Sequence, residues 1–320
     1  MYHIAAYSPN DSEIHKATDI SEVKKFLGKH PVTWLHISHP KEKDIESLAE
    51  IFGFHHLPLE DIIKFKQRPK FEDYDDHFFL TINIIEYSKA VEAHQLAMFV
   101  GDDYVVTICE KENNCIDEVL KRIESKNPRI LANKTGFLCY LILDTVTNNY
   151  FPTLDAVEGE IESIEKEIIR KASKKTLQKI FRLRKNLLLL RKAIWPAREM
   201  IYELQIADMP HSERRTTVYY RDLYDHITRV IDMVETYREL LTGSLDTYLS
   251  TISNNMNEVM KVLTVVASLM MVPTLISGIY GMNFRYMPEL AWAYGYPFAL
   301  SLMAFTMLAM IIYFRRKRWI

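Results

Sequence analysis

The sequence contains little cysteine and no apolar leader at its N-terminus. Cys109, Cys115 and Cys139 are the three cysteines in 320 residues, and none forms a CxxC pair. We interpret them as reduced thiols in a cytosolic domain. The first residues have neither a basic segment nor an apolar run of the kind found in signal peptides, so we expect the N-terminal part not to be translocated.

The short motifs of common enzyme active sites are also missing. No HExxH, GxSxG, GxGxxG or P-loop pattern occurs in the chain. His55 and His56 precede Glu60 and Asp61 and suggest a metal site, but adjacent histidines do not share a helix face. We therefore predict no catalytic residue and no catalytic cofactor. Among other functional classes, an enzyme is the main alternative to the interpretation developed below.

Charge is missing from two segments, although the whole chain is 26% charged and its mean hydropathy is −0.11. The segments are Val262–Tyr280 and Tyr296–Phe314. As a helix, each would be about 28 Å long, close to the roughly 30 Å hydrocarbon core of a bilayer. We predict transmembrane helices over 262–280 and 296–314, joined by an outer loop over 281–295.

Positive charge gathers beside these predicted spans. The tail 315–320 holds Arg315, Arg316, Lys317 and Arg318 and no acid, and Lys261 precedes the first span. Because Lys and Arg mark the cytoplasmic side of a span, both termini are expected in the cytoplasm. The chain is thus predicted to be a multi-pass protein of the cell (inner) membrane.

The first 135 residues alternate short β-branched runs with helical patterns, which predicts an α/β domain with a mixed sheet. Asp102–Asp103 between two runs predicts a hairpin. The expected strands are 33–37, 77–85, 95–100 and 104–109, and the expected helices are 42–52, 57–64 and 116–125.

Residues 136–213 have the pattern of a helical region. An acidic segment (Asp155 to Glu167) is followed by a basic one (Arg170 to Lys192), and each has apolar residues three and four apart. A basic run alone suggests nucleic-acid binding. An antiparallel hairpin with complementary charge explains both runs, so we expect no nucleic-acid partner.

Helix breakers are nearly absent from the next part of the chain. No proline occurs between Pro210 and Pro273, and Gly243 is the one glycine before Gly278. A single helix is predicted from about Arg214 to Tyr280, roughly 100 Å long. Its first part, 214–261, is a stalk that needs partners to bury its apolar face. The predicted fold class is an α+β membrane protein, in which an N-terminal α/β cytoplasmic domain leads to a stalk helix, a pore helix and two C-terminal transmembrane helices.

One stripe of this long helix combines small, polar and apolar residues. At 100° per residue, seven of its positions from Asn257 to Gly278 fall within an arc of about 120°, and Asp246, Ser250 and Ser253 continue it. Small residues suit close helix packing, whereas the polar ones favour a pore lined by symmetric copies. The predicted lining is Asp246, Asn257, Met260, Leu263, Ala267, Met271, Thr274 and Gly278.

A lining without charge suits Mg²⁺, which loses its water reluctantly and can be held through it. The Asn283 side chain and the Gly281 backbone supply neutral oxygens at the outer mouth. Carboxylates inside the membrane would be costly, and neither apolar segment contains one.

Several segments together resemble the CorA family of magnesium transporters. They are Asn257–Thr264, Gly278–Phe284 with its Gly-Met-Asn signature, Met287–Leu290 and the basic C-terminus. The resemblance covers essentially the whole chain and is strongest from Thr217 onward. It implies a homopentamer in the lipid bilayer with a cytoplasmic funnel that senses magnesium, and a selectivity filter at Gly281, Met282 and Asn283.

The same resemblance implies regulatory metal sites between subunits. Leu59–Ile62 matches one side of such a site, with Glu60 and Asp61, and Tyr220–Asp222 matches the other. Without the resemblance, these acids would be interpreted as ordinary solvated side chains. Mg²⁺ is then both the transported ion and the inhibitor, because cytosolic Mg²⁺ bridging Asp61 and Asp222 of neighbouring subunits favours a closed state.

Two alternatives stay open within the membrane interpretation. Zinc or another divalent ion is one, because a zinc-transporting branch shares the architecture, although Met282 favours magnesium and cobalt or nickel are further expected substrates. A membrane-anchored scaffold is the other, although an anchor has no need of the Gly-Met-Asn segment or the stripe.

Overall fold

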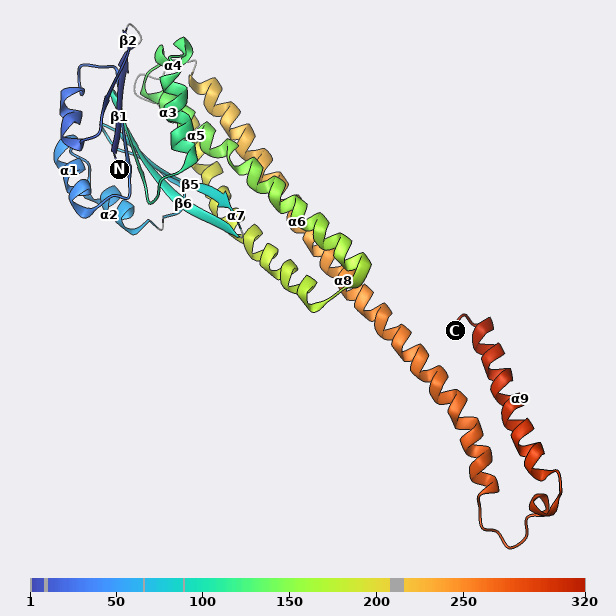
Figure 1. Cartoon of the computed structure of the whole chain (residues 1–320). Helices are drawn as coiled ribbons and strands as arrows, with labels where there is room; N and C mark the ends of the chain where they lie inside the picture. The colour runs from blue at the N-terminus through green and yellow to red at the C-terminus, as the bar shows by residue number, and fades with distance from the viewer. Residues whose placement is uncertain (1, 9–10, 66, 89, 208–215, 320) are drawn as a thin grey trace. The chain divides into compact units, whose positions relative to one another are not determined.

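The computed structural model describes residues 2–8, 11–65, 67–88, 90–207 and 216–319 (Figure 1). The chain divides into two compact units, one of Met1–Glu167 with Lys174–Ser244 and one of Ile168–Ser173 with Leu245–Ile320. The predicted helix start at Arg214 and the last residue of the predicted tail, Ile320, lie outside the described residues.

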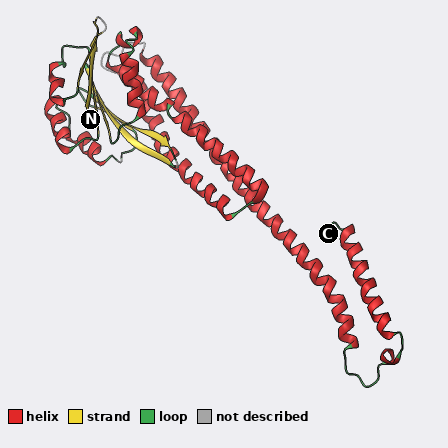
Figure 2. Cartoon of the chain, viewed as in Figure 1, coloured by secondary structure: helices red, strands yellow, loops and turns green. Residues whose placement is uncertain are grey.

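A seven-stranded mixed sheet forms the centre of the first unit (Figure 2). Its order is β2-β1-β3-β7-β6-β5-β4, and β3 and β7 are the parallel pair in it. The strands are β1 (Tyr2–Ser8), β2 (Asp11–Ala17), β3 (Val32–Ser38), β4 (Lys70–Asp73), β5 (Phe78–Tyr87), β6 (Val91–Val100) and β7 (Tyr104–Cys109).

The predicted mixed sheet and the hairpin at Asp102–Asp103 are confirmed, since β6 and β7 pair antiparallel and the Gly101 N–H donates to the Tyr104 carbonyl at 2.9 Å. Three strands were not predicted. β2 and β4 lie at the two edges of the sheet, and neither contains a continuous apolar run. β1 is paired on both sides and is buried from Ile4 to Tyr7.

Helices cover both faces of this sheet (Figure 1). On one face, η1 (Ile20–Lys25), α1 (Glu42–Phe52) and α2 (His56–Lys64) close over a core that includes Leu35, Phe99 and Ile108. The other face is covered by α5 (Thr135–Asn148) and α7 (Lys174–Ile206), and α3 (Asn114–Glu124) packs on α5. The short α4 (Pro128–Leu131) lies between α3 and α5 in the chain. The predicted helices over 42–52, 57–64 and 116–125 match α1, α2 and α3 within two residues.

The predicted charge-complementary hairpin is formed by α6 (Tyr150–Lys171) and α7 (Lys174–Ile206). Lys179 pairs with Glu167, and the Arg182 guanidinium lies 3.1 Å from the Glu160 carboxylate. Exposed pairs of this kind contribute about 0–1 kcal/mol each, so they add little to the stability of the hairpin. The basic run of α7 is thus partly neutralised by its own neighbour.

Helix α8 (Thr216–Tyr280) is continuous through Pro273, as predicted, with 65 residues. Its first part buries its apolar face within the chain, because Leu223, Ile227 and Val230 are fully buried. The expectation that the stalk needs partner copies to cover this face is therefore wrong for this segment. Polar contacts fix the packing: the Tyr220 hydroxyl donates to the Gly136 carbonyl at 2.7 Å, and that of Tyr237 to the Glu158 carboxylate at 2.8 Å.

The Tyr220 hydrogen bond gives a testable stability difference. Tyr220→Phe removes one buried hydrogen bond worth about 1 kcal/mol, which for a unit of this size lowers the thermal midpoint by about 2–4 °C. Tyr219→Phe is the matched control, because Tyr219 is on the same helix and partly exposed. Circular dichroism of the full chain in detergent checks both, and equal midpoints for parent and Tyr220→Phe would contradict this role.

The second unit holds two helices that are long and apolar enough to cross a membrane: the C-terminal part of α8 and α9 (Gly295–Arg316). Only 11% and 6% of their apolar windows are buried in the chain, so they do not behave as core helices of a soluble domain. The short η2 (Pro288–Ala291) lies in the connection between them. Near the C-terminus, Phe314 is buried and its ring stacks on Trp319, with 5.8 Å between centroids.

Candidate functional site

The stripe predicted as a pore lining is exposed along α8. All eight residues from Asp246 to Gly278 are exposed in the single chain, including large apolar side chains at Leu263 (60%) and Met271 (72%). Residues on other sides of the helix, such as Val259, Val262 and Met270, are exposed as well, so it is the combination of polar, small and apolar residues that distinguishes the stripe. The stripe is therefore a continuous surface that nothing in its own chain covers among the residues described.

A shallow groove follows the membrane part of this stripe. It is lined by Ala267, Met271, Thr274 and Gly278 from the predicted set, together with Met270, Leu275, Ile279 and Met282. A Cβ atom added at Gly278 would meet no atom of the chain within 4 Å, so packing inside the chain does not require a small residue there.

The Thr274 hydroxyl is oriented by its own helix. It donates to the Met270 carbonyl at 2.7 Å, which satisfies the polar hydrogen inside an apolar segment. The oxygen then keeps its lone pairs free for an acceptor role on the exposed stripe. Such an oxygen accepts a hydrogen bond from water bound to a cation.

The Gly-Met-Asn segment begins where α8 ends. The Gly281 N–H donates to the Ser277 carbonyl at 2.9 Å, and the Met282 N–H to the Ile279 carbonyl at 3.2 Å. A Cβ at Gly281 would lie 3.1 Å from the Ser277 carbonyl oxygen, so a larger residue would crowd this helix end. Asn283 follows directly and is exposed, which presents its amide beyond the end of the helix.

The acids predicted for regulation lie in the first unit and differ in their partners. Glu60 is exposed and pairs with Lys64 one turn later at 2.5 Å. Asp61 is only 19% exposed and accepts hydrogen bonds on both oxygens, from Gln67 Nε2 to Oδ1 and from Lys70 Nζ to Oδ2, each at 2.6 Å. Asp61 is therefore bound by two donors of its own chain, whereas Glu60 belongs to an ion pair that is exposed to solvent.

Asp222 lies on α8, on the exposed side of the helix, 58% accessible. The His226 ring stands between two acids, with Nε2 3.8 Å from Asp222 Oδ1 and Nδ1 3.9 Å from Asp144 Oδ1. Burial raises the pKa of the Asp144 carboxyl, although Arg122 and His226 oppose that change. Asp222 keeps no short ion pair among these contacts and faces solvent.

The structure does not bring the predicted regulatory acids together in one chain. Over the described ranges, no three His, Cys, Asp or Glu side chains cluster as a metal site. Glu60 and Asp61 are on α2, which covers the face of the sheet opposite to α5, and α8 packs on α5 through Tyr220 (Figure 1).

Sequence reasoning missed the partners of Asp61. Lys64 is four residues from Glu60, so helical spacing could have indicated that pair. Lys70 is on β4 and Gln67 precedes it, and neither has a fixed helical offset from Asp61. Only the tertiary fold shows that they converge on one carboxylate.

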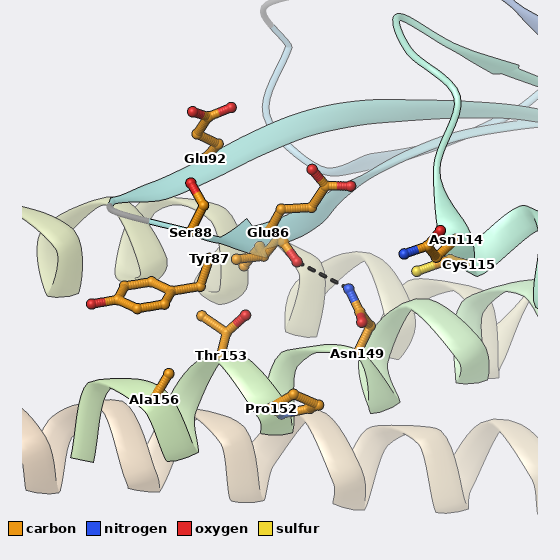
Figure 3. Close-up of a pocket in the computed structure, with 11 residues that line it drawn as sticks. Glu86, Tyr87, Ser88, Glu92, Asn114, Cys115, Asn149, Pro152, Thr153 and Ala156 are labelled. Carbon is orange, nitrogen blue, oxygen red and sulfur yellow. Dashed lines mark hydrogen bonds between the residues drawn. The ribbon is translucent and has the colours of Figure 1, made fainter. Parts of the chain in front are cut away.

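A pocket at the end of the β5–β6 hairpin is an alternative candidate site in the first unit (Figure 3). Glu86, Glu92, Cys115 and Asn149 are among its lining residues, and the Asn149 amide donates to the Ile85 carbonyl at 3.0 Å. Burial raises the pKa of the Cys115 thiol to about 12, so the sulfur stays protonated and is a poor nucleophile or metal ligand. The Asn149 hydrogen bond joins the end of α5 to β5. We therefore interpret the pocket as a gap between packed structural elements and not as a reaction site.

Comparisons with known proteins agree with the exposed membrane segment and its motif. The family described as CorA-like Mg²⁺ transporter protein matches residues 30–316. The chain is 38% identical over 318 residues to the cobalt/magnesium transport protein CorA of Thermotoga maritima, covering 98% of this chain and 91% of that protein. It is 29% identical to the protein of the same name from Methanocaldococcus jannaschii, covering 90% and 91%.

The fold agrees as well. The complete structure of the CorA magnesium transporter from Methanocaldococcus jannaschii superposes with a TM-score of 0.88 at 27% identity, covering 100% of this chain and 99% of that one. That match includes the soluble α/β part, the long helix and the two C-terminal apolar helices. The chain therefore belongs to the CorA-like Mg²⁺ transporter family.

Proposed function

We propose that this protein moves Mg²⁺ across a membrane through a pore lined by the α8 stripe of five identical copies, with both termini in the cytoplasm. The observation that carries the proposal is the uncovered stripe from Asp246 to Gly278, which ends at Gly281–Asn283. A monomeric anchor gains nothing from exposing Asn257 and Thr274 on the same line as Leu263 and Met271. A symmetric ring of such helices covers the stripe and gives its polar atoms a water-filled path.

Neutral oxygens select the ion in this mechanism. The backbone of Gly281 and the amide of Asn283 hold hydrated Mg²⁺ at the outer mouth through its waters, which avoids the cost of stripping them. Further along, the Thr274 hydroxyl accepts from those waters because its hydrogen is already used by Met270. Asn257 and Asp246 are the oxygen-bearing positions at the cytoplasmic end.

Apolar side chains of the stripe form the gate of the proposed pore. Met260, Leu263 and Met271 are exposed in the single chain, and a ring of five such side chains excludes water from a narrow pore. Closure by dewetting needs no charged gate.

The dewetting mechanism predicts that a polar residue opens the constriction. Leu263→Asn is expected to raise uptake at inhibiting cytosolic Mg²⁺ about tenfold, because the amide hydrates the closed pore. Leu263→Met keeps the position apolar at similar volume and should behave as the parent. Initial uptake rates into proteoliposomes check this, and a Leu263→Asn variant as tightly closed as the parent would contradict the proposed gate.

Cytosolic Mg²⁺ is the proposed inhibitor. Asp61 of one subunit and Asp222 of the next supply carboxylates to a shared ion, with Glu60 nearby, and this ion stabilises the closed assembly. The support is that Asp222 is exposed and that α2 and α8 are on opposite sides of the sheet, so a bridge requires two copies. When the ion leaves, repulsion between the acids loosens the interface, and the population shifts toward open states.

Uptake into proteoliposomes with an entrapped magnesium dye tests the proposal. We expect the parent protein to fill magnesium-free vesicles and protein-free vesicles to stay dark. Parallel vesicles with zinc, cobalt and nickel indicators address the other proposed substrates. Zinc uptake without magnesium uptake would favour the zinc alternative, and no uptake of any ion by inserted protein would favour a membrane anchor.

A further inference from the structure

The carboxylate of Asp61 already has a cationic partner in its own chain. Lys70 Nζ donates to Oδ2 and Gln67 Nε2 to Oδ1, so both oxygens are occupied. The pair is substantially shielded, with side-chain exposures of 29% for Lys70 and 19% for Asp61. A divalent ion that binds this carboxylate must either displace one of the two donors or bind with the Lys70 ammonium close to it.

Lys70 has a second acidic partner and is stabilised in its charged form. Its Nζ also lies 2.6 Å from the Glu72 carboxylate and sits over the Phe79 ring at 5.4 Å from the centroid. Burial disfavours the ammonium, but hydrogen bonds to Asp61 and Glu72 outweigh it and raise the pKa of Lys70. Because Glu72 remains as a partner, Lys70 can release Asp61 without losing every ionic contact.

The neighbouring acids lack such an arrangement. The Glu60–Lys64 pair has side-chain exposures of 56% and 62%, so water screens it strongly. Asp222 has an imidazole nitrogen at 3.8 Å and is exposed. Of the three acids proposed for regulation, Asp61 alone combines shielding with a short ion pair from another element of the fold.

We propose that Lys70 is a tethered competitor of the regulatory cation, and that its ammonium on Asp61 sets the cytosolic Mg²⁺ concentration at which the protein closes. The inference rests on the proposed regulatory role of Asp61. With Mg²⁺ absent, Lys70 neutralises Asp61 and limits the repulsion across the interface. With Mg²⁺ present, the ion displaces Lys70 toward Glu72. This exchange weakens the apparent affinity of the regulatory site for Mg²⁺.

Removing the ammonium is therefore expected to tighten inhibition. Lys70→Met should lower the half-inhibiting internal Mg²⁺ concentration about tenfold, since a partly shielded positive charge beside the ion is removed. Lys70→Gln, which keeps an N–H donor without charge, should shift it in the same direction. Lys70→Arg retains the cation and should stay close to the parent. Lys64→Met, which breaks the exposed pair on Glu60, is the matched control and should shift the value less than about twofold.

A second readout separates this inference from the transport proposal. The thermal midpoint of the full chain in detergent, followed as MgCl₂ is added, reports ion binding without transport. Half of the stabilisation should be reached at about tenfold lower Mg²⁺ in Lys70→Met, and Asp61→Asn with Lys70→Met should lose that gain. An unchanged or raised half-point in folded Lys70→Met and Lys70→Gln overturns the inference. A parent that binds Mg²⁺ but takes none up overturns the transport proposal alone.

Discussion

Replacing Asn283 by alanine is expected to lower the initial rate of magnesium uptake by about a hundredfold, because the proposed selectivity site loses its amide oxygen. Asn283 is exposed and follows the end of α8 by three residues, so its side chain supports no buried contact. The variant should therefore insert and assemble as the parent does. Dye uptake into proteoliposomes and the assembly size in detergent are the two measurements.

The matched control for this change is Asn255→Ala. Asn255 is exposed on α8, but it points about 160° from Asn257 around the helix and so lies away from the stripe. It should keep near-parental uptake. If Asn283→Ala transports as well as Asn255→Ala, the Gly-Met-Asn segment is not the selectivity site.

Replacing Asp222 by alanine is expected to remove most of the inhibition by cytosolic magnesium. The parent should slow several-fold as internal Mg²⁺ rises, whereas Asp222→Ala should stay open, because the proposed bridging ion loses one of its two carboxylates. Uptake is compared at fixed ratios of external to internal Mg²⁺, so that the driving force is equal. In the absence of internal Mg²⁺, parent and variant should transport at similar rates.

Asp225→Ala is the control for the charge itself. Asp225 is exposed on the same helix, three residues after Asp222, so its replacement changes the net charge of α8 equally. Its inhibition should match the parent. Equal inhibition in parent and Asp222→Ala would show that this acid takes no part in closure.

Much of the fold was predictable because it depends on local pattern. The β-branched run in β7 and the absence of proline from α8 specify those elements directly, and the charge runs of α6 and α7 specify their pairing. The edge strands β2 and β4 were not predictable, since their residues are polar and their pairing comes from the neighbouring strand. Whether the face of α8 around Ile227 is covered by its own chain also depends on tertiary packing.

The candidate site also has a part that local pattern predicts and a part that only the tertiary fold shows. Helical periodicity alone placed Asn257, Leu263 and Thr274 on one line, and the structure shows that line exposed. The sequence contained no signal for Lys70, because β4 and α2 meet only in the folded domain. The proposed site between copies would have no local pattern, so only family resemblance links Asp61 and Asp222.

The most direct measurement is the initial rate of magnesium uptake by the parent protein in proteoliposomes, first in magnesium-free vesicles and then at a low and a high internal Mg²⁺ concentration with the external-to-internal ratio held fixed. We expect fast uptake into magnesium-free vesicles, and several-fold slower uptake at the high than at the low internal Mg²⁺ concentration. Absence of uptake by inserted, assembled protein in magnesium-free vesicles would contradict magnesium transport. Fast uptake that ignores internal Mg²⁺ would contradict its regulation by the transported ion.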